Sequence, residues 1–250
     1  MEILDSYITS SKIIYRGLHD NISPENSIGA IKKAIAKGYA LELDLRMLTD
    51  GTIVVFHDER LGRMTKTDGF LSNCAYEDIK GLTLLKSDEH IPTLLEVLKV
   101  IDGKVPVIFD IRNIDMIGVE KNVWKALKPY KGEYAIQSVN PYTLEWFKCN
   151  APAVKRGQLA SFFKGEKGKE LSFWNRFKLK RLMLCAHVSE PNFISYDADN
   201  LPNRFVKKFS HLPILAWKVG DAETLDRVKN CSSNIVYDGI DPETIGIEQN

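Results

Sequence analysis

Short strand-like segments and longer helix-like segments alternate along almost the whole chain, and this alternation restricts the fold more than any other feature. Strand character appears around residues 13, 42, 108, 136, 157, 194, 216 and 236, and helical segments separate most of these. Eight β/α alternations favour a closed parallel barrel. A doubly wound open sheet is the main alternative, but no glycine-rich dinucleotide motif follows the first strand. We therefore expect an α/β fold, a (β/α)8 TIM barrel, as a single domain over residues 1–250.

The first part of the chain predicts a strand, a helix, a strand and a hairpin arm. The strands are expected at Lys12–Tyr15 and Ala40–Arg46, with a helix over Ser27–Lys37 that either Asn26 or Ser27 can cap. Thr52–Phe56 should return as a hairpin arm after an Asp-Gly turn. Residues 59–90 are polar, irregular and long for a connector, so we expect a small inserted lobe after the second strand.

The remaining elements continue the alternation. Further strands are expected at residues 105–111, 134–138, 154–159, 193–196, 214–219 and 234–237, and helices at residues 76–80, 93–101, 115–127, 141–149, 171–187, 202–209 and 222–229.

Acidic residues occupy one face of the second predicted strand. Glu42 and Asp44 are two residues apart and therefore point to the same side. Taken alone, this pattern favours an edge strand with both carboxylates in water. In a buried parallel strand the two charges would repel each other unless a hard divalent cation, Mg²⁺ or Ca²⁺, neutralised them. Asp110 ends a neighbouring predicted strand, and Arg16 and Arg112 would add positive charge suited to a phosphate ester.

Composition excludes several classes of function. The chain has 34 basic and 33 acidic side chains, so bulk charge predicts no nucleic-acid binding. No apolar run approaches the length that spans a bilayer, and the first residues lack the pattern of a signal peptide. The four cysteines are scattered without metal-binding or redox spacing. We expect reduced, mostly buried thiols in a cytoplasmic protein.

The segment Phe162–Arg181 mixes aromatic and basic residues. Such a segment can lie on an anionic membrane. Over membrane contact, which stays the alternative, we favour a loop and an ordinary outer helix of the barrel with its aromatic side chains turned inward.

Short motifs in a fixed order resemble the glycerophosphodiester phosphodiesterase family. In the N-terminal part they are Tyr15-Arg16-Gly17, Pro24-Glu25-Asn26-Ser27, Glu42-Leu43-Asp44, Thr49-Asp50-Gly51 and the run from His57-Asp58 to Thr65. Later matches are Val107–Arg112, Gln137-Ser138, Gly157, Ala216-Trp217 and Tyr237-Asp238-Gly239. The resemblance spans nearly the whole chain and implies a small-molecule phosphodiester substrate, hydrolysed to glycerol 3-phosphate and an alcohol in glycerophospholipid catabolism.

The resemblance also implies a set of site residues. Three carboxylates would hold the divalent cation, and histidine would act in general acid–base catalysis. The metal ligands implied are Glu42, Asp44 and Asp110, the catalytic residues His57, Arg16 and Tyr15, and the substrate-binding residues Arg112, Glu25 and Trp217. The attacking group can be water or a neighbouring hydroxyl of the substrate.

Tyr15 departs from the family pattern, which has a second catalytic histidine at this position. A phenol titrates near pH 10, so Tyr15 can donate a proton but is a poor base at pH 7. His19 could substitute, although we favour a solvated loop residue there. The family also has glutamate at Asp110 and lysine at Arg112. The alternative to a hydrolase is therefore a catalytically impaired pseudoenzyme that binds a phosphodiester or sugar phosphate. A sugar-phosphate isomerase or aldolase would need a lysine or paired base that we cannot place.

Overall fold

A computed structural model of the chain describes residues 6–112, 118–164 and 173–245. Two compact units make up the chain. The N-terminal unit is Ile14–Tyr134, and the C-terminal unit combines Met1–Ile13 with Ala135–Asn250. Both consist of parallel strands alternating with helices, and the eight parallel strands confirm the predicted fold class, a (β/α)8 TIM barrel with a small insertion after the second strand.

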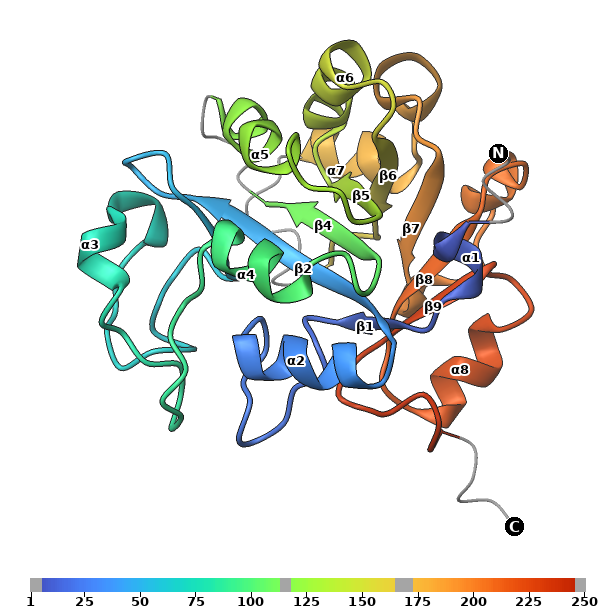
Figure 1. The fold of residues 1–250 in the computed structure, drawn as a ribbon. Helices are drawn as coiled ribbons and strands as arrows, with labels where there is room; N and C mark the ends of the chain where they lie inside the picture. Colours follow the sequence, from blue (N-terminus) through green and yellow to red (C-terminus); the bar gives the residue numbers. More distant parts are fainter. Residues whose placement is uncertain (1–5, 113–117, 165–172, 246–250) are drawn as a thin grey trace. The chain divides into compact units, whose positions relative to one another are not determined.

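The N-terminal unit is arranged around strand β2 (Figure 1). Its elements are β1 Ile13–Tyr15, α2 Ile28–Ala36, β2 Ala40–Met47, β3 Ile53–Val55, η2 Leu71–Asn73, α3 Tyr76–Ile79, α4 Leu94–Ile101, β4 Val107–Ile111 and α5 Val119–Leu127. Strand β2 runs parallel to β4, with Asp44 opposite Asp110, and antiparallel to β3, with Leu45 opposite Val55. The antiparallel pair is the predicted hairpin arm. Strand β1 also pairs with β2.

Capping residues explain where the helices of this unit begin. The Ser27 hydroxyl accepts a hydrogen bond from the backbone N–H of Ala30, and Thr93 forms a capping box with Glu96. Asp102 then ends α4 in the left-handed conformation. These local signals confirm both helices to within one residue of their predicted ends.

The insertion shares a hydrophobic cluster with the segments on either side of it. Leu61, Met64, Leu71, Ile79 and Leu84 of the insertion are buried together with Leu48, Val54, Phe56 and Ile91 from the segments on either side of it. Because apolar side chains from β3 and its flanks contribute to this cluster, burial of apolar surface fixes the insertion to the strand that precedes it.

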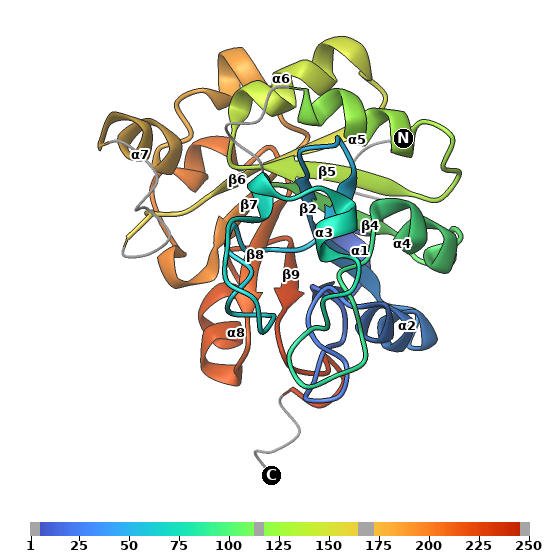
Figure 2. The same cartoon turned by 90° about the vertical axis from the view of Figure 1, so that its left-hand side faces the viewer.

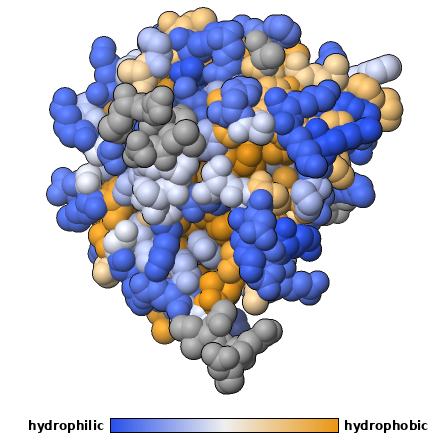
Figure 3. All heavy atoms as spheres, turned by 90° about the vertical axis from the view of Figure 1, so that its right-hand side faces the viewer, coloured by the Kyte–Doolittle hydropathy of each residue, from blue (hydrophilic) through white to orange (hydrophobic). Residues whose placement is uncertain are grey.

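The C-terminal unit contains five neighbouring parallel strands in the order β9-β8-β7-β6-β5. Its elements are α1 Tyr7–Ser10, β5 Tyr134–Ser138, α6 Pro141–Asn150, β6 Lys155–Ala160, α7 Phe173–Lys180, η4 Cys185–Ser189, β7 Phe193–Asp197, η5 Ala198–Asn200, η6 Val206–Phe209, β8 Ile214–Val219, α8 Ala222–Val228 and β9 Asn234–Tyr237. Strand interiors are buried, whereas on the face drawn in Figure 3 hydrophilic side chains cover most of the surface.

Two helix predictions in this unit are wrong in extent. The helix expected at residues 171–187 includes two residues outside the described ones; the described helix α7 ends at Lys180, near Leu182 in the left-handed conformation, and a π-helical turn follows at Cys185–Ser189. The helix expected at residues 202–209 is only the short 3-10 turn η6. The side chain of Asn203 accepts hydrogen bonds from the N–H groups of Phe205 and Val206, which favours a cap over a longer helix.

All four cysteines lie in the described part of the chain, and none forms a disulfide. Only Cys185 is buried and Cys149 is exposed, so the expectation of mostly buried thiols is wrong. Each helix among the described residues is too short or too polar to cross a bilayer.

Candidate active site

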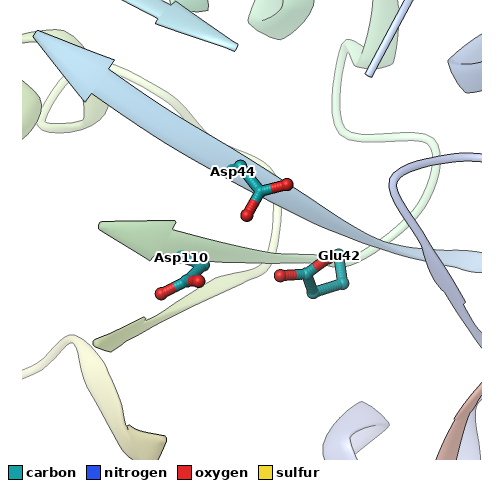
Figure 4. Close-up of side chains that lie close together, drawn as sticks. All are labelled: Glu42, Asp44 and Asp110. Atoms are coloured by element: carbon teal, nitrogen blue, oxygen red, sulfur yellow. The ribbon is translucent and has the colours of Figure 1, made fainter. Parts of the chain in front are cut away.

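Three acidic side chains meet on strands β2 and β4 of the N-terminal unit. The parallel register sets Asp44 directly beside Asp110, and Glu42 lies two residues earlier on the same face of β2. Figure 4 shows the three carboxylates turned toward a common space. One carboxylate oxygen from each lies within 4.8 Å of the others, and all three residues are buried, at most 2% exposed. The edge-strand interpretation of Glu42 and Asp44 is therefore wrong, since β2 has a paired strand on each side.

Two arginines compensate part of this negative charge. Arg16 Nε lies 2.9 Å from Asp44 Oδ2, and Arg112 Nη1 lies 2.9 Å from Asp110 Oδ2 and 3.4 Å from Asp44 Oδ1. Burial acts to raise the pKa of the Asp44 carboxyl, but the nearby Arg16, His57 and Arg112 hold this pKa below its usual value. Glu42 is in the opposite situation, because burial and the charges of Asp44 and Asp110 raise its pKa.

The donor set fits a hard divalent cation. Carboxylate oxygens are the ligands that Mg²⁺ and Ca²⁺ prefer. Three buried carboxylates with two contacting arginines leave an excess of one negative charge if all are ionised, and the raised pKa values of Glu42 and Asp110 show that the protein alone stabilises that state poorly. A divalent cation held by the three carboxylates would neutralise this excess negative charge.

The loop after β1 aims Arg16 and Asn26 at the cluster. Both have positive φ angles, 57° and 61°, and Gly17 has φ 80° with Ala30 only 2.9 Å from the position that a Cβ would take. The Asn26 Nδ2 donates to Asp44 Oδ2 at 2.9 Å. Asn26 was predicted only as a possible helix cap, a role that Ser27 fills, so its contact with Asp44 was missed.

A chain of ion pairs joins Arg16 to the histidine of the site. Glu25 Oε1 lies 2.6 Å from Arg16 Nη1 and accepts from Arg63 Nη2 at 2.6 Å. Arg63 also pairs with Asp58, whose Oδ1 lies 2.5 Å from His57 Nδ1. The side chain of Arg16 thus contacts both Asp44 and Glu25.

His57 is placed to exchange protons in its neutral form. Burial is the largest effect on this imidazole and lowers its pKa to about 4, against the opposing influence of Asp44. The contact with Asp58 at Nδ1 leaves Nε2 as the other titratable nitrogen, and the backbone carbonyl of His57 accepts from Arg46 Nε at 2.7 Å. The sequence analysis assigned no role to Arg63, because its partner Glu25 lies 38 residues away in the chain.

Tyr15 ends β1 beside Arg16. Its side chain is buried, the phenol oxygen accepts a hydrogen bond from Arg16 Nη2, and the Arg16 guanidinium lies 4.3 Å from the ring centroid. Burial raises the pKa of the phenol well above its usual value, so Tyr15 stays protonated at neutral pH. His19 lies partly buried in the loop between β1 and α2. Trp217 lies on β8 of the C-terminal unit, and its substrate-binding role stays a prediction.

Comparison with known proteins identifies the family. The family model described as the glycerophosphoryl diester phosphodiesterase family matches residues 16–209. A glycerophosphodiester phosphodiesterase of Caldanaerobacter subterraneus subsp. tengcongensis is 37% identical over 159 residues, which cover 59% of this chain and 65% of that protein. The match thus spans slightly less than two thirds of that relative. YhdW of Bacillus subtilis is 31% identical over 87% of this chain and 89% of its own length.

Solved structures agree on the fold. An Oleispira antarctica phosphodiesterase in complex with its product sn-glycerol-3-phosphate has a TM-score of 0.74 at 21% identity, over 92% of this chain and 93% of that chain. A glycerophosphodiester phosphodiesterase from Thermotoga maritima has a TM-score of 0.67 at 22% identity, over 91% and 94% of the two chains. The ordered motifs, the buried carboxylates and the family match lead to one conclusion: the chain belongs to the glycerophosphoryl diester phosphodiesterase family, a family of phosphoric diester hydrolases.

Proposed function

We propose that this protein hydrolyses glycerophosphodiesters to glycerol 3-phosphate and an alcohol in a reaction that depends on Mg²⁺ or Ca²⁺, as a step in glycerophospholipid catabolism. The observation that carries the proposal is the buried cluster of three carboxylates contacted by two arginines. The names of the relatives and the product bound to the Oleispira antarctica phosphodiesterase support the substrate class.

Each residue of the cluster has a proposed role. Glu42, Asp44 and Asp110 would hold the cation, which when bound supplies Lewis-acid stabilisation of a phosphoryl oxygen. Arg112 contacts two of these carboxylates and is half-buried beside them, so its remaining N–H groups are suited to the nonbridging phosphate oxygens. Arg16 is held by Asp44 and Glu25 and would add positive charge on the side of β1.

Proton transfer is assigned to His57 and Tyr15. His57 is neutral at pH 7 and can accept a proton at Nε2, while Asp58 orients the ring through Nδ1. Tyr15 keeps its phenolic proton and can donate it, but not act as a base. We further propose that residues 1–250 act as one domain, with residues 59–90 as an inserted lobe, in the cytoplasm.

A second candidate function is that of a pseudoenzyme that binds a phosphodiester or sugar phosphate without turning it over. The observation in its favour is Tyr15, whose phenol is buried and bonded to Arg16 where the family has a histidine. The loss of one proton-transfer group typically lowers a rate by about 10²–10⁴-fold.

An assay of glycerol 3-phosphate release separates the two functions. Purified protein is incubated with glycerophosphocholine and glycerophosphoethanolamine, with Mg²⁺, Ca²⁺ or a chelator, and wild type is compared with His57→Ala and Tyr15→His. His90→Ala is the matched control, because the His90 side chain is 40% exposed and its described contact is with the helix-capping Glu96. A hydrolase shows cation-dependent release that His57→Ala abolishes and His90→Ala retains. If wild type equals His57→Ala and Tyr15→His gains rate, the pseudoenzyme is the correct function.

A further inference from the structure

Helix α7 in the C-terminal unit presents large apolar side chains to solvent. None of its eight residues is buried, and Phe173 and Trp174 are 67% and 65% exposed. Met183, just beyond the helix, is 50% exposed. The expectation that the aromatic side chains of this helix turn inward is therefore wrong for Phe173 and Trp174, whereas Phe163, in the loop before the helix, is buried. Figure 2 shows α7 at the outer edge of its unit, to the left in that view.

A pocket of about 720 Å³ lies beside these exposed rings. Among the residues that the structure describes, its lining consists of five phenylalanines and five cationic side chains, without an acidic residue. The cations are Lys164, Arg176, Lys180, Arg181 and Arg204. An opening with apolar walls and only positive charge is suited to a ligand that carries an anionic group next to hydrocarbon.

Aromatic rings lie against two of these cations, Arg181 and Arg204. The Arg181 guanidinium lies 3.5 Å from the centroid of Phe177 and 5.3 Å from that of Phe205, and Arg204 lies 5.2 Å from the Phe205 centroid. None of the ion pairs found among the described residues involves any of the five cations. Apart from Arg181 Nη1, which donates to the Phe177 carbonyl, and the buried Arg176 Nε, none of the polar N–H groups of these cations has a described partner that would compete with an external anion.

The positive charge of this region is local. Residues 173–183 and 201–211 together contain seven lysines and arginines and no acidic residue, whereas the whole chain has a net charge of only +1. The stretch 165–172, which precedes α7, has two lysines and two glutamates and so adds no net charge. A local basic surface on a nearly neutral protein indicates a specific anionic partner rather than general polyanion binding.

We propose that this surface, comprising α7, Met183 and the adjoining pocket, docks the protein on an anionic phospholipid bilayer. Phe173, Trp174 and Met183 would enter the interfacial region, and the cations would bind headgroup phosphates, with the phenylalanine walls of the pocket against the first hydrocarbon carbons. Nucleic acid fits less well, because the chain's pI of about 7.6 lies far below the range of typical nucleic-acid-binding domains. The surface shares no residue with the candidate active site, so this proposal does not depend on the proposed hydrolysis.

Co-sedimentation of the full chain with vesicles tests the proposal. We expect binding to vesicles of phosphatidylcholine with phosphatidylglycerol at low salt, weak binding to pure phosphatidylcholine, and release at about 1 M salt, where the screening length falls to about 3 Å. Each neutralised cation near the bilayer should weaken binding about fivefold, so Arg176→Gln/Lys180→Gln should bind roughly 25-fold more weakly by the same principle.

Matched variants distinguish vesicle binding by this surface from non-specific binding by any exposed apolar or charged residue. Trp174→Ser should lower vesicle binding, whereas Leu95→Ser, at a residue that is also 65% exposed but on α4, should not. Lys99→Gln on α4 serves as the charge control. No sedimentation with anionic vesicles at low salt would overturn the proposal. Equal binding by the α7 variants and the α4 controls, or tighter binding to a single-stranded oligonucleotide than to vesicles, would overturn it as well.

Discussion

Replacing Glu42 by glutamine probes the charge balance of the carboxylate cluster. Two unit charges 4.8 Å apart repel each other by about 3.5 kcal/mol at an effective dielectric constant of about 20. Glu42 faces two such neighbours, partly compensated by Arg16 and Arg112, and is 2% exposed. Without a divalent cation, Glu42→Gln should therefore be as stable as wild type or up to about 3 kcal/mol more stable.

Addition of a divalent cation should reverse the order of stability. A cation at 100 times its dissociation constant stabilises wild type by about 2.7 kcal/mol. That corresponds to a rise in Tm of roughly 5–11 °C for a chain of this size. Glu42→Gln loses one of three ligands and should lose most of this rise.

Thermal unfolding, followed by circular dichroism with chelator, Mg²⁺ or Ca²⁺, measures both effects. Glu77→Gln is the matched control, since Glu77 forms only a surface pair with Lys80 and should change stability by less than about 0.5 kcal/mol in every buffer. The reasoning fails if Glu42→Gln unfolds at a lower temperature than wild type in chelator and both proteins gain equally from the cation.

Three further predictions concern other parts of the molecule. Asp58→Asn should lower kcat at least about tenfold by freeing the His57 ring, as measured by glycerol 3-phosphate release; a rate equal to that of the surface control Asp68→Asn would remove this role. Gly157→Ala should cost about 1–3 kcal/mol in urea unfolding, because its Cβ would lie 2.2 Å from the Phe193 ring; Gly81→Ala, with open space around it, is the control, and equal effects would contradict the packing argument. Burial raises the pKa of Cys185 to about 12, against about 8.5 in an unfolded chain, so the unfolded state loses a proton first and stability falls as pH rises from about 9 to 12. Urea unfolding at pH 8 and 10 should show a smaller decline for Cys185→Ala than for wild type, and parallel declines would assign the effect elsewhere.

Local patterns in the sequence were enough to predict the order of the helices and strands. The alternation of strand and helix segments, the Asp50-Gly51 turn and the caps at Ser27 and Thr93 all act over a few residues, and the structure confirms each. The prediction of a helix at residues 202–209 was wrong because the side chain of Asn203 accepts hydrogen bonds from the backbone N–H groups of Phe205 and Val206. Hydrophobic periodicity does not reveal such a bond.

The candidate site was only partly accessible from the sequence. Glu42, Asp44 and Asp110 could be proposed as a cluster from strand ends and from the family resemblance. The roles of Asn26 and Arg63 could not, because each depends on a side-chain contact that forms only when the loop after β1 and the insertion are in place.

The sequence by itself determined the barrel class, the family and the acidic face of β2, because hydrophobic periodicity and ordered motifs are properties of neighbouring residues. The tertiary structure decided the register that sets Asp44 beside Asp110, the ion-pair chain from Arg16 to His57, and the exposure of Phe173 and Trp174. The register and the ion-pair chain depend on contacts between residues far apart in the chain. The exposure of Phe173 and Trp174 depends on the absence of such contacts. Burial and charge pairing of that kind arise only when the segments pack together.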